Sequence, residues 1–245
     1  MNVTAIIQAH MGSLRLPGKV LLDLEGKPVL ERVVERTQRC RLIDRVVVAT
    51  STRDCDQVLV DFCKKINVGC FCGDHDDVLS RFAETARAYP AKFYVRITSD
   101  CPLLEPSVSD QIIGAFLKKQ PGVDYASNKI PQSFPRGLDT EIFTHEALEK
   151  ANSQAREVYQ RRHVTPYLYE HSELFRLLSI TSDTDRADWR WTLDTREDLE
   201  FIRKVYAYFK GRSYFSWNDV LALLEKQPQL KEINKHVVQK ALKEG

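Results

Sequence analysis

The chain has 245 residues, and its 36 Lys and Arg residues against 34 Asp and Glu residues leave a formal net charge of only +2. Binders of nucleic acids or of membrane surfaces in general need a basic excess, so this balance argues against both classes. No apolar run approaches the roughly 20 residues that span a bilayer. The first residues, MNVTAIIQAHMG, lack the basic segment of a secretory signal. We therefore expect a cytoplasmic protein.

Short β-type runs alternate with amphipathic helical patterns over the first hundred residues. Strands are predicted at 3–9, 45–50, 68–71 and 93–97, and helices at 29–40, 58–66 and 78–89. This order predicts an α/β fold of the Rossmann-like kind, with a mixed, mainly parallel sheet and helices on both faces. Such sheets bind ligands at the carboxyl ends of their strands, which here are the loops after residues 9, 50, 71 and 97.

The second half of the chain has a looser pattern. Helices are predicted at 108–119, 145–151, 156–170, 217–226 and 230–243, and short strands at 124–128 and 141–143. Two further strands, at 175–181 and 189–193, are expected with an antiparallel direction. Thr195 is a good N-cap for a helix that ends near residue 209. Because no linker is visible, we predict a single domain over 1–245, with a subregion at 130–175 and closing helices within 217–243.

Six cysteines, at positions 40, 55, 63, 70, 72 and 101, are spread along the chain. In a chain without a secretory signal we expect them to be reduced and mostly buried. Cys70 and Cys72 form a C-x-C pair, but no second pair completes a zinc site.

The loop after the first strand carries two cations and two glycines, in the stretch IIQAHMGSLRLPGKVL at 6–21. It is not a Walker-type loop, because five residues instead of four separate its glycines and no hydroxyl residue follows Lys19. Gly12 and Ser13 can turn backbone N–H groups outward, and Arg15 and Lys19 add positive charge. This pattern predicts a cradle for a polyphosphate, although a solvated basic turn has the same composition.

This loop resembles the signature loop of the cytidylyltransferases that make CMP-activated sugars. The resemblance is closest to the branch called spore-coat polysaccharide biosynthesis protein F, a relative of the CMP-Kdo and CMP-sialic acid synthetases. Further blocks match in the same order, to about residue 206: GKPVL (26–30), VVVAT (46–50), GDHDDVLSR (73–81), RITSDCPL (96–103), PRGLDTEIF (135–143), HVTPY (163–167) and WTLDTREDLE (191–200).

The resemblance implies a nucleotide-diphospho-sugar transferase fold and a specific reaction. CMP would pass from CTP to an acidic sugar of the nonulosonate or Kdo type, with release of pyrophosphate, for the biosynthesis of a surface polysaccharide or glycan. Transfer of this kind depends on positioning and on neutralisation of phosphate charge, for which the implied cofactor is Mg²⁺. The implied partners are CTP and a small acidic sugar, with neither nucleic acid nor membrane.

Residue roles follow from the matching blocks. The resemblance implies that Mg²⁺ is held by Asp100 and Asp194, and that Arg15, Lys19 and Asp100 act in catalysis. It places the nucleotide against Gln8, Ala9, His10, Gly12, Ser13, Arg15, Lys19, Asp77 and Arg81, and the acceptor against Arg136, Asp139, Glu141 and His163. Taken without the family pattern, Asp100 reads as a turn residue before a proline, Asp194 as a helix N-terminal carboxylate, and His163 as a core or capping histidine.

One residue departs from the family pattern. The branch usually has Arg where this chain has His10, and neutral imidazole brings no charge to a triphosphate near pH 7. Two other classes of protein stay open. A catalytically impaired nucleotide-binding homologue would explain His10. A glycosyltransferase of related fold would need an Asp-x-Asp after a central strand, but Ser99, Asp100, Cys101 and Pro102 follow the strand at 93–97 without such a pair. Asp183 and Asp185 have the spacing, but they lie in a polar stretch far from that strand.

The relatives are often homodimers, so a homodimer is expected. The partner surface is predicted in the region 130–175, whose aromatic side chains look exposed in the sequence: Phe134, Tyr159, Tyr167 and Tyr169. Ordinary core packing explains these aromatics nearly as well.

Overall fold

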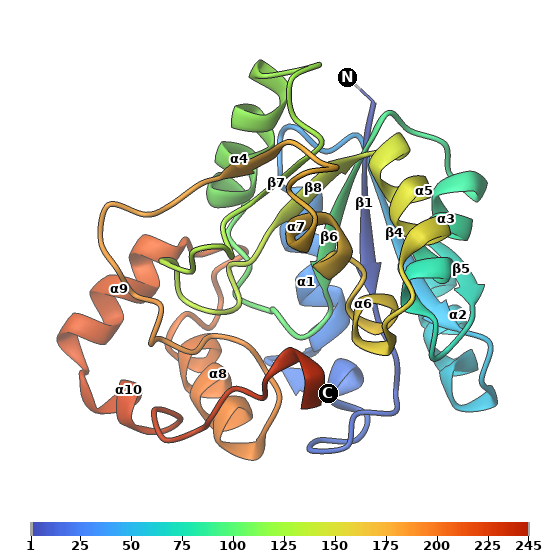
Figure 1. The fold of residues 1–245 in the computed structure, drawn as a ribbon. Helices are drawn as coiled ribbons and strands as arrows, with labels where there is room; N and C mark the ends of the chain where they lie inside the picture. Colours follow the sequence, from blue (N-terminus) through green and yellow to red (C-terminus); the bar gives the residue numbers. More distant parts are fainter. Residues whose placement is uncertain (1, 245) are drawn as a thin grey trace.

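The centre of the fold is a seven-stranded sheet, seen in the computed structural model, which describes residues 2–244 (Figure 1). Its strands in chain order are β1 (Val3–Gln8), β4 (Arg45–Ser51), β5 (Gly69–Gly73), β6 (Phe93–Thr98), β7 (Tyr125–Ser127), β8 (Glu141–Thr144) and β9 (Leu177–Ser179). They lie in the order β5-β4-β1-β6-β8-β7-β9. Strand β8 is antiparallel to both of its neighbours, and every other pairing is parallel. The predicted mixed, mainly parallel sheet is confirmed.

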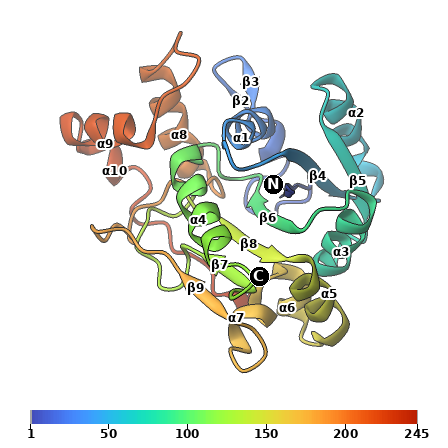
Figure 2. The same ribbon diagram turned by 90° about the horizontal axis from the view of Figure 1, so that it is seen from above.

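Helices cover both faces of this sheet because its central strands are apolar on both sides. In β1, Val3, Ala5 and Ile7 pack into one core and Ile6 into the other. The first face is covered by α1 (Val29–Gln38), α2 (Gln57–Lys65), α4 (Pro106–Lys118), α8 (Arg196–Tyr208) and α9 (Trp217–Lys226). The second is covered by α3 (Val78–Ala88), α5 (His145–Gln154) and α7 (Pro166–Glu170) (Figure 2). A hairpin of β2 (Asp23–Leu24) and β3 (Lys27–Pro28) precedes α1.

The predicted elements of the first hundred residues are confirmed to within two residues at each end. Four predictions in the second half are wrong, and the first two concern α6 and α7 and the direction of β9. The single helix expected at 156–170 is divided into α6 (Val158–His163) and α7, because Val164 has a positive φ of 72°, which no helix allows, and Pro166 begins the next helix. Strand β9 lies parallel to β7, where an antiparallel direction was expected.

The strand expected at 189–193 does not form. This segment makes one isolated bridge between Arg136 and Arg190 and no ladder. The close approach needs Gly137, whose φ is +105° and whose missing Cβ would lie 2.6 Å from the carbonyl carbon of Trp191.

The long helix predicted at 230–243 does not form either. Only α10 (Gln229–Glu232) and a 3-10 turn, η3 (Leu242–Glu244), form there. Beyond α10 no apolar face packs against the core, and the Val238 side chain is 82 % exposed, so tertiary packing does not support a continuous helix. The chain instead runs irregularly and ends beside α6 (Figure 1).

The aromatic side chains of the expected partner surface are largely internal. Phe134 and Tyr167 are buried, and Tyr159 and Tyr169 are half-buried, so the prediction that they are exposed is wrong. Phe134 packs beside Trp217, and Tyr167 packs against Phe175. The homodimer and the single domain over 1–245 both stay predictions.

Two predictions made from composition bear on the surface and the thiols. Within residues 2–244, no helix is long and apolar enough to cross a membrane. All six cysteines are free thiols, but only Cys40, Cys63 and Cys101 are buried, so the expectation of mostly buried thiols holds for half of them.

Candidate active site

A cavity of about 520 Å³ opens at the carboxyl ends of β1 and β6, where the parallel sheet predicts a ligand site. We call it the strand-end cavity. It is bordered by β8, by the loop at 129–139, by the segment at 192–194 and by the C-terminal segment. Eight of the predicted site residues line it: Gln8, Arg15, Asp100, Arg136, Asp139, Glu141, His163 and Asp194.

Lys19 joins the two predicted metal carboxylates. Its Nζ lies 2.8 Å from Asp100 Oδ2 and 2.8 Å from Asp194 Oδ1, and it also donates to the carbonyl oxygen of Leu193 at 2.8 Å. Gly18 places it there, because its left-handed backbone (φ 67°) turns the loop into the short η1 helix (Lys19–Leu21). The three side chains come from distant parts of the chain and meet at one point.

Electrostatic attraction dominates this group of charges. Burial opposes the charge of the Lys19 ammonium, but Asp100 and Asp194 outweigh it and raise the Lys19 pKa. Burial likewise acts to raise the pKa of Asp100, and the Lys19 ammonium outweighs it, holding that pKa well below its usual range. Lys19 and Asp100 are therefore both charged at neutral pH.

Two arginines form ion pairs with the Asp194 carboxylate oxygen that does not contact Lys19. Asp194 Oδ2 lies 3.0 Å from Arg15 Nη2 and 2.9 Å from Arg190 Nη2. The Arg190 guanidinium also donates to both carboxylate oxygens of buried Asp198, from Nε at 2.8 Å and from Nη2 at 3.0 Å. Asp198 also accepts from the backbone N–H of Thr195 and so completes the capping box of α8. The helix start thus fixes the orientation of the Asp194 carboxylate.

Glu141 organises the opposite wall of the cavity. It is 1 % exposed and accepts hydrogen bonds from Arg96, from Tyr125 Oη at 2.7 Å and from Thr165 Oγ1 at 2.6 Å. Burial acts to raise its pKa, but the cations Lys129 and Arg96 and these hydrogen bonds lower it to about 2. Glu141 is therefore a charged anchor that presents Arg96 and Lys129 to the cavity.

The other three residues predicted to bind the acceptor sugar are Arg136, Asp139 and His163, and they differ in whether their side chains already have hydrogen-bond partners. Asp139 accepts from Gln132 Nε2 at 3.1 Å and from the backbone of Gly137 at 3.3 Å. His163 Nε2 lies 3.1 Å from the carbonyl oxygen of Leu242, and burial, helped by nearby Arg96, lowers its pKa to about 4. The Arg136 guanidinium has no hydrogen-bond or ion-pair partner among residues 2–244 and is available to a ligand.

The predicted nucleotide residues outside the strand-end cavity lie in the loop after β1 and beside it. Ala9 is buried and donates to Ala49, while Gly12 and Ser13 are accessible. The His10 ring packs edge-on against His75 with ring centroids 5.8 Å apart, and its Nδ1 is buried without a partner. Burial lowers the pKa of His10, so this position carries a neutral ring where the family pattern has a cation.

Asp77 and Arg81 are already engaged in the fold. Asp77 caps α3 by accepting from Ser80 N at 2.9 Å and pairs with Arg161 Nε at 2.7 Å. Arg81 is 2 % exposed and donates to the carbonyl oxygen of Asp74 at 2.6 Å. Neither borders the strand-end cavity, and their nucleotide role stays a prediction.

The donor set fits a hard divalent cation only in part. No group of three or more His, Cys, Asp or Glu side chains within residues 2–244 is arranged to hold a metal ion. Asp100 and Asp194 do converge, and Mg²⁺ binds through one or two carboxylates completed by substrate phosphates and water. Asp183 and Asp185, the spacing considered for a glycosyltransferase, are exposed and lie outside the cavity.

Several residues in and around the cavity were missed from the sequence. Arg96 had a usable signal, because a charge inside the buried strand FYVRI requires a buried partner. Asp198 also had a signal, because an acid three residues after the N-cap Thr195 can complete a capping box. Arg190, Gln239 and Lys240 gave no local signal, since their positions depend on how distant segments meet.

The sheet topology and the basic loop at its carboxyl edge define a nucleotidyltransferase of Rossmann-like fold. The chain belongs to the cytidylyltransferase family, whose model matches residues 4–237. It is 32 % identical to the spore coat polysaccharide biosynthesis protein SpsF of Bacillus subtilis, over 93 % of this chain and 95 % of that one. It is 41 % identical over 123 residues to the 3-deoxy-manno-octulosonate cytidylyltransferase of Geobacter sulfurreducens, covering 50 % of this chain and 48 % of that one.

A solved structure agrees over almost the whole chain. The cytidylyltransferase from Leptospira borgpetersenii superposes with a TM-score of 0.90 at 33 % identity, covering 98 % of this chain and 100 % of that one. The predicted family and fold are therefore confirmed.

Proposed function

We propose that this protein is a Mg²⁺-dependent cytidylyltransferase that transfers CMP from CTP to an acidic sugar and releases pyrophosphate. The observation that carries the proposal is the meeting of Lys19 and Arg15 with Asp100 and Asp194 at the edge of the strand-end cavity. Two cations suited to phosphates and two carboxylates suited to a hard cation thus lie beside a space for an acceptor. Similarity to a cytidylyltransferase named for 3-deoxy-manno-octulosonate supports the acidic sugar.

In the proposed reaction a sugar hydroxyl oxygen attacks the α-phosphorus of CTP. The new P–O bond forms as the bond to the β-phosphate breaks, and the hydroxyl proton passes to solvent water. Asp100 and Asp194 would hold Mg²⁺, which when bound neutralises charge on the phosphates. Lys19 and Arg15 then act as fixed cations beside the leaving pyrophosphate, where negative charge grows. In this scheme Lys19 exchanges part of its carboxylate contact for phosphate contact when the nucleotide arrives.

The charge of the cavity wall supports an anionic acceptor. Its cationic side chains outnumber its carboxylates by five to four: Arg15, Arg96, Lys129, Arg136 and Lys240 against Asp100, Asp139, Glu141 and Asp194. Metal binding would neutralise two of the carboxylates and leave a clear positive excess. Arg136 presents a planar guanidinium to the cavity, which suits bidentate pairing with a sugar carboxylate.

The test is pyrophosphate release with Mg²⁺, each of the four nucleoside triphosphates and a panel of 2-keto-3-deoxy acidic sugars. We expect release with CTP and one of these sugars, its loss on chelation with EDTA, and its return with added Mg²⁺. Asp100→Asn should abolish it, and Asp61→Asn, at an exposed site that contacts Gln57 and Lys64, should not. CTP binding by calorimetry without release for any acidic sugar would refute the acceptor class. Absence of CTP binding would favour the impaired homologue suggested by His10.

A further inference from the structure

The C-terminal segment at 235–243 forms one side of the strand-end cavity. Gln239, Lys240, Ala241 and Leu242 all line it. The segment follows α10 without regular structure until η3 and passes in front of the fold to α6 (Figure 1). Most of its side chains are exposed, so little packing holds it in place.

Hydrogen bonds from Arg190 and His163 fasten this segment to residues of the site. Gln239 Oε1 accepts from Arg190 Nη1 at 2.6 Å, and the same guanidinium donates to Asp194 Oδ2 at 2.9 Å. Nearer the end, the Leu242 carbonyl oxygen lies 3.1 Å from His163 Nε2, which must be the donor because a carbonyl only accepts. The segment is therefore connected to the carboxylate side of the cavity and to its acceptor side.

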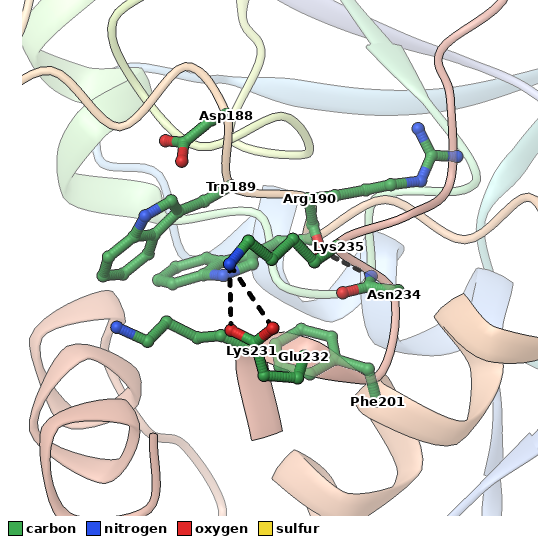
Figure 3. A pocket seen from close by; sticks show the side chains of 9 residues that line it. Asp188, Trp189, Arg190, Phe201, Lys231, Glu232, Asn234 and Lys235 are labelled. Carbon is green, nitrogen blue, oxygen red and sulfur yellow. Dashed lines mark hydrogen bonds and ion pairs between the residues drawn. The ribbon is translucent and has the colours of Figure 1, made fainter. Parts of the chain in front are cut away.

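The segment has a fixed root. Asn234 is 3 % exposed and donates from Nδ2 to Asp198 Oδ1 and to the carbonyl oxygen of Arg190, both at 2.9 Å. Figure 3 shows this root beside a second, smaller cavity of about 130 Å³, with the Arg190 side chain pointing away from Trp189. Lys235 is already at the surface, where it pairs with Glu232. Residues beyond Asn234 can thus move without exposing the core.

We propose that residues 235–243 are a strap that opens to admit the acceptor, closes over it and contributes the Lys240 ammonium to acceptor binding. The inference rests on the proposed function and adds a specificity-determining residue to it. Lys240 is exposed, lines the cavity, and has no hydrogen-bond or ion-pair partner among residues 2–244. An anionic acceptor group seated in the cavity would supply that partner. Gln239 is a positioning residue, which couples strap closure to the Arg190–Asp194 ion pair.

The first experiment compares Lys240→Gln with Lys235→Gln in the full-length protein. The two lysines lie on the same exposed segment, but only Lys240 lines the cavity. We expect Lys240→Gln to raise the acceptor KM about tenfold, the effect of losing one charge-assisted hydrogen bond. The KM for CTP, kcat and the melting temperature should change little. Lys235→Gln should leave all four quantities unchanged, and an unchanged acceptor KM in Lys240→Gln would overturn the role of Lys240.

The second experiment removes the strap by ending the chain after Asn234, which keeps the buried root. CTP affinity by calorimetry should stay within about twofold, whereas the acceptor KM should rise by more than in Lys240→Gln. Hydrogen exchange in the full-length protein should slow at 235–243 only when the acceptor is added. A truncated protein with the wild-type acceptor KM, or exchange unaffected by acceptor, would overturn the strap. Wild-type protein that binds CTP but turns over no acidic sugar would refute the proposed acceptor instead, and the strap inference with it.

Discussion

Replacing Lys19 by Met tests whether the Lys19 ammonium stabilises the fold by neutralising the carboxylates of Asp100 and Asp194. Met keeps most of the side-chain volume and removes the ammonium that lies 2.8 Å from both Asp100 and Asp194. Asp194 retains Arg15 and Arg190, but Asp100 loses its only cationic partner within residues 2–244. The substitution therefore leaves one poorly solvated carboxylate without a counter-charge.

The size of the effect follows from how deeply the pair is buried. Removing one partner of a fully buried ion pair costs about 3–5 kcal/mol. Because the Asp100 side chain is 23 % exposed and that of Asp194 is 17 % exposed, we expect a smaller loss, about 2–3 kcal/mol at pH 7. For a chain of this size each kcal/mol lowers the melting temperature by about 2–4 °C.

The loss should depend on pH with a defined sign. In the wild type the folded pKa of Asp100 lies below its unfolded value, so its contribution to stability is present above about pH 4 and is lost only at more acidic pH. Without Lys19, only the hydrogen bonds from Thr98 and Cys101 oppose burial, so we expect burial to dominate and to raise the folded pKa of Asp100 above the unfolded value. The variant then regains stability relative to the wild type as falling pH protonates this carboxyl.

The measurement is urea denaturation of both proteins at pH 8 and at pH 4.5. Lys27→Met is the matched control, since the Lys27 side chain is 38 % exposed and its ion pairs with Glu31 and Glu35 lie at the surface. It should change the free energy of unfolding by less than about 0.5 kcal/mol. The reasoning is refuted if Lys19→Met costs no more than this control, or if its cost is the same at both pH values.

Three further predictions concern other parts of the site. The folded pKa of His163 is about 4 against an ordinary 6.5, so its contribution to stability is present above pH 6.5 and is lost as pH falls toward 4. Between pH 7 and pH 4.5, the free energy of unfolding of His163→Gln should therefore fall by about 2 kcal/mol less than that of the wild type. Urea denaturation measures both losses, and equal losses would contradict the prediction. His10→Arg should tighten CTP binding about tenfold at pH 8 by calorimetry, since it restores a cation where the ring is now neutral, and an unchanged Kd would sink the idea. Gly137→Ala should destabilise the protein by about 3 kcal/mol, because its Cβ would lie 2.6 Å from the Trp191 backbone. Gly26→Ala is the control, since Gly26 also has a positive φ but faces open space, and it should cost about 1 kcal/mol. Equal drops in melting temperature would count against the steric argument.

Local sequence pattern determined the first half of the fold. The runs VTAIIQ and RVVVATS are apolar on both sides, so they specify strands covered by helices on both faces, wherever the rest of the chain lies. The N-cap Thr195 with Asp198 likewise specified the start of α8 without tertiary information. The loop with Arg15 and Lys19 and the two aspartates were found from their motifs, and the structure brings them together.

Only the tertiary structure decided what surrounds those residues. Lys19 lies 81 residues from Asp100 and 175 from Asp194 in sequence, so no local pattern shows that its ammonium sits between them. Arg190 lies between Asp194 and Asp198 because Gly137 lets the loop at 129–139 approach the segment at 189–193 closely. The sequence at 230–243 has a helical pattern, but most of this segment is irregular and exposed in the structure. Segments without a buried apolar face are positioned by the partners they reach, and those partners are known only once the chain has folded.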